Sequence, residues 1–321
     1  MKDSIGILAP GKGWGNFVSY ISCFKTISEN RNKKVALITK KFSSAKSYLY
    51  DQNFVEKFIE IPDNTRGIIN KIKSVIYIYK ELKKLNLNEI FIFHSSPLYV
   101  IISYLAKINK IYAPGIKYQN FFLKKKFKYY ESYKSKLIDP VEESKELIKK
   151  ILNIKHVPFK ILKYDGKIDQ KKIAICVACS GYERQWGSEN YIKLIKYLAS
   201  LNYQKFLILS GKDQSEIENE IIEKSDKKLE FIKTSMKKID EVIVDLKNCK
   251  LLIGNDTGFT HLAIAYGKKS FVILGDCPPH TYSDLIIPID KDENLPRTSS
   301  SIKSTTYEKV ISVFNKHENR Y

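Results

Sequence analysis

The sequence predicts an α/β protein made of two Rossmann-like domains that face one another across a cleft. The chain has 321 residues, about two domains at ~150 residues each, and its 43% hydrophobic content can fill two cores. Apolar, β-rich runs alternate with helical patterns in both halves of the chain. A polar stretch, Tyr164–Lys172, interrupts this alternation, so we predict one domain over residues 1–165 and another over residues 166–321.

In the first half, short apolar runs predict strands and periodic apolar positions predict helices. The expected strands are Ser4–Pro10, Lys34–Lys40, Phe54–Pro62, Glu89–Ser95 and Lys110–Pro114. The expected helices are about Gly15–Ser28, Arg66–Leu85 and Pro97–Ile108, with a further one that begins near Asp139. The order is the strand, helix, strand rhythm of a parallel sheet.

The same rhythm restarts in the second half. The expected strands are Ile173–Ala178, Lys205–Ser210, a short one at Phe231, Lys250–Gly254 and Ser270–Leu274. The expected helices are Ser188–Leu201, Ser215–Lys224, Ile239–Lys247, Phe259–Tyr266 and the terminal Thr306–Lys316. We expect the terminal helix to pack across the domains, and a ligand to bind at the carboxyl ends of the strands.

The formal net charge of +20 favours anionic partners such as sugar nucleotides, phosphorylated glycolipids and acidic membrane surfaces. Only five of the 55 basic residues are arginine, the residue that proteins use most to read bases and phosphates of nucleic acids. We therefore expect no nucleic-acid partner.

A cytoplasmic location is expected from the N-terminus and from the cysteines. The first strand-like run begins at Ser4, with no signal-peptide core, and no apolar stretch approaches the ~18 residues of a membrane span. The five cysteines are scattered, which indicates reduced thiols. Cys176 and Cys179 form a C-x-x-C pair, but no second pair completes a zinc site.

The most informative stretch is IGNDTGFTHLA, residues 253–263, where an apolar run ends in a turn and a helical pattern follows. Unpaired backbone N–H groups and the positive end of the helix dipole would favour a diphosphate at Asp256-Thr257-Gly258. His261 follows about one turn into the helix. The alternative is that Asp256 or Thr257 only caps the helix and that His261 is a core residue.

Two further loops also follow a strand and precede a helix. The first, CSGYERQWGS, places Arg184 next to Trp186, which suits a phosphate partly shielded from water. Its alternative is an ordinary loop in which the indole packs and the guanidinium is solvated. The second, LSGKDQSE, carries Ser215 and Glu216, polar groups that can reach ribose hydroxyls.

In this order and spacing, the three loops resemble the C-terminal half of glycosyltransferase family 9, the heptosyltransferase-like enzymes of lipopolysaccharide core assembly. The likeness is strongest in LLIGNDTGFTHLAIAYGKKSFVILG and covers most of the second domain. ILAPGKGWGNFVSYISCFKTI is similar to the first strand, glycine loop and helix of the family.

The resemblance implies the two-domain fold called GT-B, with an N-terminal acceptor domain and a C-terminal donor domain. It implies inverting transfer of a sugar, heptose or another, from a nucleotide diphosphate to a lipopolysaccharide or related glycan or glycolipid. No metal or other cofactor is required, and the chain has no Asp-x-Asp metal motif in a suitable loop. The implied donor contacts are Arg184, Asp256, Thr257, Gly258 and His261, with ribose near Ser215 or Glu216.

The chain departs from the family pattern where the catalytic base is expected. The family has Gly-Asp in its first glycine loop, whereas this chain has Gly15-Asn16, and an amide cannot accept a proton at neutral pH. His94 and Glu183 are the other candidates for the base. The alternative function is a catalytically silent protein that binds a sugar nucleotide.

A lysine-rich, aromatic segment, Lys117–Lys136, is the candidate for peripheral contact with the anionic inner membrane. It holds seven lysines among aromatic side chains, which suit lipid head groups and the membrane interface respectively. The alternative is an insertion with buried aromatic residues and solvated lysines.

Overall fold

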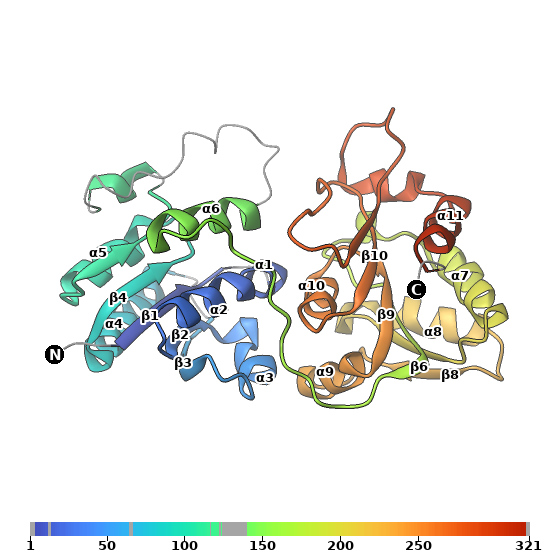
Figure 1. Cartoon of the computed structure of the whole chain (residues 1–321). Coiled ribbons are helices and arrows are strands. Elements are labelled where there is room, and N and C mark those ends of the chain that lie inside the picture. The colour runs from blue at the N-terminus through green and yellow to red at the C-terminus, as the bar shows by residue number, and fades with distance from the viewer. Residues whose placement is uncertain are drawn as a thin grey trace. The chain divides into compact units, whose positions relative to one another are not determined.

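The computed structural model describes residues 4–11, 14–63, 67–115, 117–121, 123 and 140–318. Internal contacts divide the chain into two compact units, Met1–Lys160 and Ile161–Tyr321, here called the N-terminal and C-terminal domains (Figure 1). Each is built on its own parallel sheet. The sequence places the boundary after residue 165, whereas the contacts divide the chain after Lys160.

The N-terminal domain contains a five-stranded parallel sheet in the order β3-β2-β1-β4-β5. Its strands are β1 (Ser4–Ala9), β2 (Val35–Lys40), β3 (Val55–Ile61), β4 (Leu87–Ile92) and β5 (Lys110–Tyr112). Its helices include α1 (Trp14–Ser19), α2 (Ile21–Asn30), α3 (Ala45–Leu49), α4 (Ile68–Leu85), α5 (Pro97–Leu105) and α6 (Pro140–Leu152). Helices α4 and α5 pack together, and their buried apolar residues join those of the sheet in one core.

The C-terminal domain contains a six-stranded parallel sheet in the order β11-β10-β9-β6-β7-β8. Its strands are β6 (Asp169–Cys176), β7 (Lys205–Leu209), β8 (Glu230–Lys233), β9 (Cys249–Asn255), β10 (Lys269–Ile273) and β11 (Ile286–Ile289). Its helices include α7 (Ser188–Ser200), α8 (Ser215–Lys224), α9 (Ile239–Lys247), α10 (Gly258–Ala265) and α11 (Tyr307–Glu318). Helices α7, α8 and α11 lie on one side of the sheet, and α9 and α10 on the other (Figure 1).

Alternation of apolar residues explains how the central strands of this sheet are covered. Ile173 and Ile175 of β6 join Leu194 and Leu198 of α7 in one fully buried cluster. Phe314 of α11 belongs to the same cluster. The two α/β domains confirm the predicted fold class.

The last helix was predicted to pack across the domains. Its described contacts with α7 and β11 lie within the C-terminal domain, where the Phe314 and Phe271 rings are 5.1 Å apart. Packing against the other domain therefore stays a prediction.

Several local features differ from the sequence expectation, among them the short helix α3, which was not predicted. The helix expected over Gly15–Ser28 is divided at Tyr20, whose N–H bonds to the Phe17 carbonyl at 3.2 Å. Strand β6 begins inside the stretch expected to be a linker. Strand β11 was not predicted because Pro288 cannot donate to a ladder, yet proline is tolerated here because β11 is an edge strand.

Within the described parts of the chain, no helix has both the length and the apolar character that crossing a bilayer requires. The lysine-aromatic segment Lys117–Lys136 falls mostly outside the described residues. Its first residues form the short 3-10 helix η2 (Lys117–Phe121), on which Tyr118 and Phe121 are exposed.

Candidate functional site

The candidate site lies at the carboxyl ends of β6 and β9 in the C-terminal domain. These two strands are neighbours, and the chain builds the sheet outward from them in opposite directions. Loops that follow such a pair diverge and leave a crevice, the usual ligand position in open α/β sheets. The Arg184 loop follows β6 and the Asp256 turn follows β9, so the fold brings two of the three predicted loops together.

Gly254 and Asn255 fix the position of the turn after β9. Gly254 has φ +149°, and a Cβ there would stand 2.1 Å from the Cys176 carbonyl oxygen, so only glycine fits without backbone movement. The buried Asn255 amide donates to the Val177 and Ala178 carbonyls, each at 3.2 Å. It also accepts from the Tyr191 hydroxyl at 2.8 Å. The turn is therefore tied to the end of β6.

Helix α10 begins at Gly258 with Thr257 as its N-cap residue in extended conformation, but the Thr257 side chain makes no capping hydrogen bond. Its hydroxyl instead lies 3.2 Å from Cys176 Sγ. The structure therefore contradicts the alternative in which the Thr257 side chain caps the helix. The Thr257 side chain does not occupy the N-terminus of α10, the place where the phosphate hypothesis puts an anion.

Asp256 lies between two histidines. Its Oδ2 is 3.1 Å from Nε2 of His280, and its Oδ1 is 3.4 Å from Nε2 of His261. Burial acts to raise the pKa of Asp256, but the His280 hydrogen bond and the nearby His261 outweigh it, so the pKa is lowered. Nδ1 of His261 is 2.6 Å from the Tyr282 hydroxyl. His261 is buried, as the core alternative expected, yet it faces the site.

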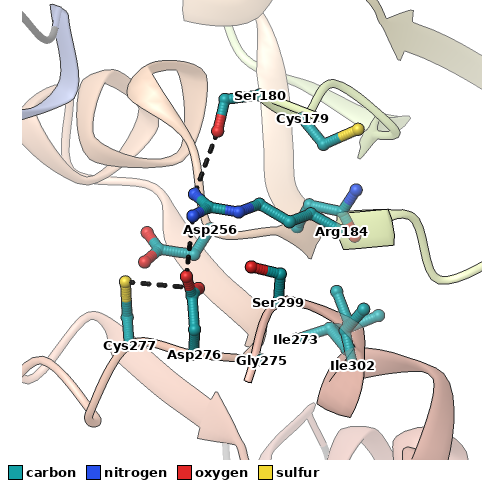
Figure 2. A pocket seen from close by; sticks show the side chains of 11 residues that line it. Cys179, Ser180, Arg184, Asp256, Ile273, Gly275, Asp276, Cys277, Ser299 and Ile302 are labelled. Atoms are coloured by element: carbon teal, nitrogen blue, oxygen red, sulfur yellow. Dashed lines mark hydrogen bonds and ion pairs between the residues drawn. The ribbon is translucent and has the colours of Figure 1, made fainter. Parts of the chain in front are cut away.

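Arg184 lines a small cavity of about 50 Å³ together with Asp256 and Asp276. Its Nη1 donates to the Ser180 hydroxyl at 3.0 Å, and its Nη2 lies 2.8 Å from Oδ2 of Asp276, as Figure 2 shows. The Arg184 side chain is 40% exposed, so the guanidinium can reach a ligand. Trp186 is buried, and its indole N–H donates to the Thr305 carbonyl at 2.6 Å. The indole therefore anchors the loop that carries Arg184.

A second cavity of about 330 Å³ adjoins the same loop. Tyr182 and Gln185 line it on one side, and Asp213 and Glu216 on the other. Ser215 is the first residue of α8 and is not among the residues that line this cavity. The volume lies in the range of pockets that bind small ligands.

The candidates for the catalytic base lie in both domains. Asn16 is in α1, which follows β1, and His94 comes just after β4, the strand beside β1. Nδ1 of His94 accepts a hydrogen bond from the Ser96 N–H at 2.9 Å, so a proton taken up at Nδ1 would break that bond. Glu183 is exposed in the short 3-10 helix η5 (Tyr182–Arg184) of the C-terminal domain. The role of each stays a prediction.

Comparison with known proteins identifies the family of this chain. Residues 99–308 match the family model described as glycosyltransferase family 9 (heptosyltransferase). The match covers more than half of the chain. The chain belongs to glycosyltransferase family 9. A search of curated protein sequences found no match.

Solved structures show that this family 9 chain has the fold of heptosyltransferases. A family 9 glycosyltransferase from Veillonella parvula is 12% identical with a TM-score of 0.76 over 98% of this chain and 97% of that one. E. coli heptosyltransferase WaaC with ADP is 13% identical, with a TM-score of 0.74 over 97% and 99%. E. coli ADP-heptose lps heptosyltransferase II is 15% identical, with a TM-score of 0.75 over 98% and 99%. The predicted GT-B type of fold is confirmed.

Three residues of the candidate site were not found from the sequence. Asp276, His280 and Tyr282 follow β10, the strand next to β9, and contact Arg184, Asp256 and His261 respectively. The position after a strand was the available signal, since parallel strands bring their carboxyl ends to one edge. The stretch GDCPPHTY offered no helical or phosphate-loop pattern that would have drawn attention to it.

Proposed function

We propose that this family 9 protein is an inverting glycosyltransferase. It transfers a sugar, heptose or another, from a nucleoside diphosphate to a lipopolysaccharide or related surface glycan. The observation that carries the proposal is the cavity at the ends of β6 and β9, which Arg184 and Asp256 line. Helix α10 begins two residues after Asp256, and the side chain of its N-cap residue, Thr257, does not cap its start. A guanidinium and backbone N–H groups are the donors that bind phosphate oxygens.

In the proposed complex, the diphosphate lies against Arg184, Thr257 and Gly258, and the nucleoside lies in the larger cavity. Glu216 lines that cavity and presents a carboxylate that can accept hydrogen bonds from ribose hydroxyls. Both cavities adjoin the loop from Ser180 to Ser188, so one ligand can span them.

In the proposed reaction, an acceptor hydroxyl oxygen attacks the anomeric carbon of the sugar from the face opposite the diphosphate. The bond from this carbon to the diphosphate oxygen breaks, and its electron pair leaves with the nucleoside diphosphate. The hydroxyl proton passes to a base. Arg184 and the N–H groups of α10 stabilise the negative charge that develops on the leaving group, so the transfer itself requires no metal.

Residue 16, where the resemblance to the family predicts an aspartate base, is asparagine in this chain. This observation favours a second candidate function, a protein that binds the nucleotide sugar without turnover. The two candidates share the donor site and differ in whether product forms.

The donor site is tested by calorimetric titration of metal-stripped protein with ADP, GDP, UDP and CMP in the presence of a chelator. We expect saturable binding of one nucleoside diphosphate. Arg184 and the start of α10 would bind its phosphates, and the larger cavity would bind its nucleoside. If none of the four nucleotides binds, the proposed function is wrong, whereas binding without transfer to any glycan would favour the silent alternative.

Asp276 is expected to compete with the diphosphate for Arg184. The Asp276→Asn variant should bind the nucleoside diphosphate about 2- to 5-fold more tightly. This factor corresponds to the free energy of a partly exposed ion pair, which the wild type must break before Arg184 can bind the diphosphate. Calorimetry of both proteins measures the change. Asp290→Asn is the matched control, because Asp290 forms a similarly exposed ion pair with Arg297 in the same domain. Equal tightening in the control, or none in Asp276→Asn, would contradict the competition.

The proposed acceptor is a membrane glycolipid, so we place the protein at the cytoplasmic face of the inner membrane. The first half of α4 supports this placement, because four isoleucines on it are exposed: Ile68, Ile69, Ile72 and Ile76, at 76%, 70%, 53% and 47%. Lysines interleave with them, and Glu81 is the one acidic residue of the helix. Apolar side chains flanked by lysines suit an anionic bilayer surface.

The Ile69→Gln/Ile72→Gln double variant should bind vesicles that contain phosphatidylglycerol about 10-fold more weakly than the wild type, because it loses apolar area that would enter the bilayer. Co-sedimentation with these vesicles and with neutral phosphatidylcholine vesicles measures the effect. Val244→Gln on α9 is the control, since Val244 is 60% exposed but lies in the other domain. Equal binding of the wild type and the double variant would exclude α4 as the contact.

A further inference from the structure

Three side chains of the C-terminal domain, those of Asp256, His261 and His280, lie close together. The sequence did not predict a joint role for them. One donor atom each from Asp256, His261 and His280 lies within 4.8 Å of the others. Asp256 and His261 come from the turn after β9 and from α10, whereas His280 comes from the loop after β10. Two separate loops therefore bring one carboxylate and two imidazoles to one place.

The spacing of these atoms suits a metal ion. Ligands about 2.0–2.1 Å from a tetrahedral centre stand about 3.4 Å apart. Nε2 of His261 is 3.4 Å from Oδ1 of Asp256, and Nε2 of His280 is 3.1 Å from Oδ2. The two imidazole centroids are 5.0 Å apart and their planes are inclined by 70°, so the rings approach the carboxylate from different directions.

Oδ1 of Asp256 is a buried oxygen with no hydrogen-bond partner in the described part of the chain. Nε2 of His261 lies 3.4 Å from this oxygen and does not form a hydrogen bond with it. A buried carboxylate oxygen without a hydrogen-bond donor is costly, and a cation bound at this oxygen would offset that cost.

Tyr282 supplies the outer contact that histidine ligands usually have. Its hydroxyl lies 2.6 Å from Nδ1 of His261, which leaves Nε2 of that ring directed to Asp256. When Nδ1–H donates to the phenol oxygen, Nε2 carries the lone pair that binds a metal. The ring is also stacked on Tyr282, with centroids 5.9 Å apart and planes inclined by 27°.

We propose that Asp256, His261 and His280 form a binding site for a divalent first-row transition metal such as Zn²⁺ or Fe²⁺. Two imidazoles and one carboxylate are a ligand set of such ions and leave coordination positions open. An open position next to the start of α10 suits a phosphate oxygen. The metal site stands on these three side chains and does not rest on the proposed transfer, which requires no metal.

The probe for this site is Co²⁺, added to the metal-stripped full-length protein without nucleotide. The wild type should bind one equivalent, seen as visible absorption that Zn²⁺ abolishes. His280→Ala should weaken Co²⁺ binding at least about 10-fold because a ligand is lost, and Tyr282→Phe should weaken it through the outer contact. His156→Ala, which removes an exposed histidine of the other domain, is the matched control and should leave the affinity unchanged.

The site is excluded if the wild type shows no saturable Co²⁺ binding, or if His280→Ala binds as tightly as the wild type. Far-ultraviolet circular dichroism shows whether each variant is folded. If His280→Ala does not fold, Tyr282→Phe serves as the test variant in its place. Nucleotide titration in chelator, described above, reports separately on the donor site. Failure of one proposal is therefore distinguishable from failure of the other.

Discussion

The Asn16→Asp variant is expected to transfer sugar about 10²- to 10⁴-fold faster than the wild type, the usual contribution of a positioned general base. The substitution introduces a carboxylate at the point of the first glycine loop where the resemblance to the family predicts the catalytic base. Asparagine and aspartate have nearly the same shape, so the change is in proton affinity and not in packing. Release of the nucleoside diphosphate with a lipopolysaccharide-type acceptor measures the rate.

The control for this prediction is Asn30→Asp, which adds the same charge at an exposed position at the end of α2. Its rate should equal that of the wild type. If Asn16→Asp is no faster than the wild type, residue 16 is not the position of the base. His94→Gln and Glu183→Gln then identify which of the other two candidates carries the proton, by loss of transfer.

Arg184→Ala is expected to weaken binding of the nucleoside diphosphate about 100-fold, since the variant removes the cation of a charge-assisted contact in a partly enclosed crevice. The loss exceeds that of a surface arginine because the cavity also holds the carboxylates of Asp256 and Asp276, which repel the phosphates once the guanidinium is gone. Calorimetric titration in chelator gives the two dissociation constants.

Arg297→Ala is the matched variant for this measurement. Arg297 lies in the same domain, is 32% exposed and also pairs with an aspartate, Asp290, but it does not line the cavity. We expect its affinity for nucleotide to be that of the wild type. An Arg184→Ala protein that binds as tightly as Arg297→Ala would place the diphosphate elsewhere.

Much of the fold follows from local pattern. Strand β9 and helix α10 were predicted within a residue or two, because an apolar run before Gly-Asn-Asp-Thr-Gly and an apolar helical repeat after it leave few alternatives. The helix α8, Ser215–Lys224, was predicted with the bounds that the structure has. Strand β11 escaped prediction because its proline is compatible only with an edge, and being an edge is a property of the whole sheet.

The sequence by itself determined most of the strands and helices and the loops that carry Arg184 and Asp256, since these depend on residues close together in the chain. Only the tertiary structure decided what the loop after β10 does. Pairing of β9 with both β6 and β10 brings Asp276 to Arg184 and His280 to Asp256. Such contacts arise from strand order, which is fixed by packing between distant segments, and local sequence pattern carries no record of it.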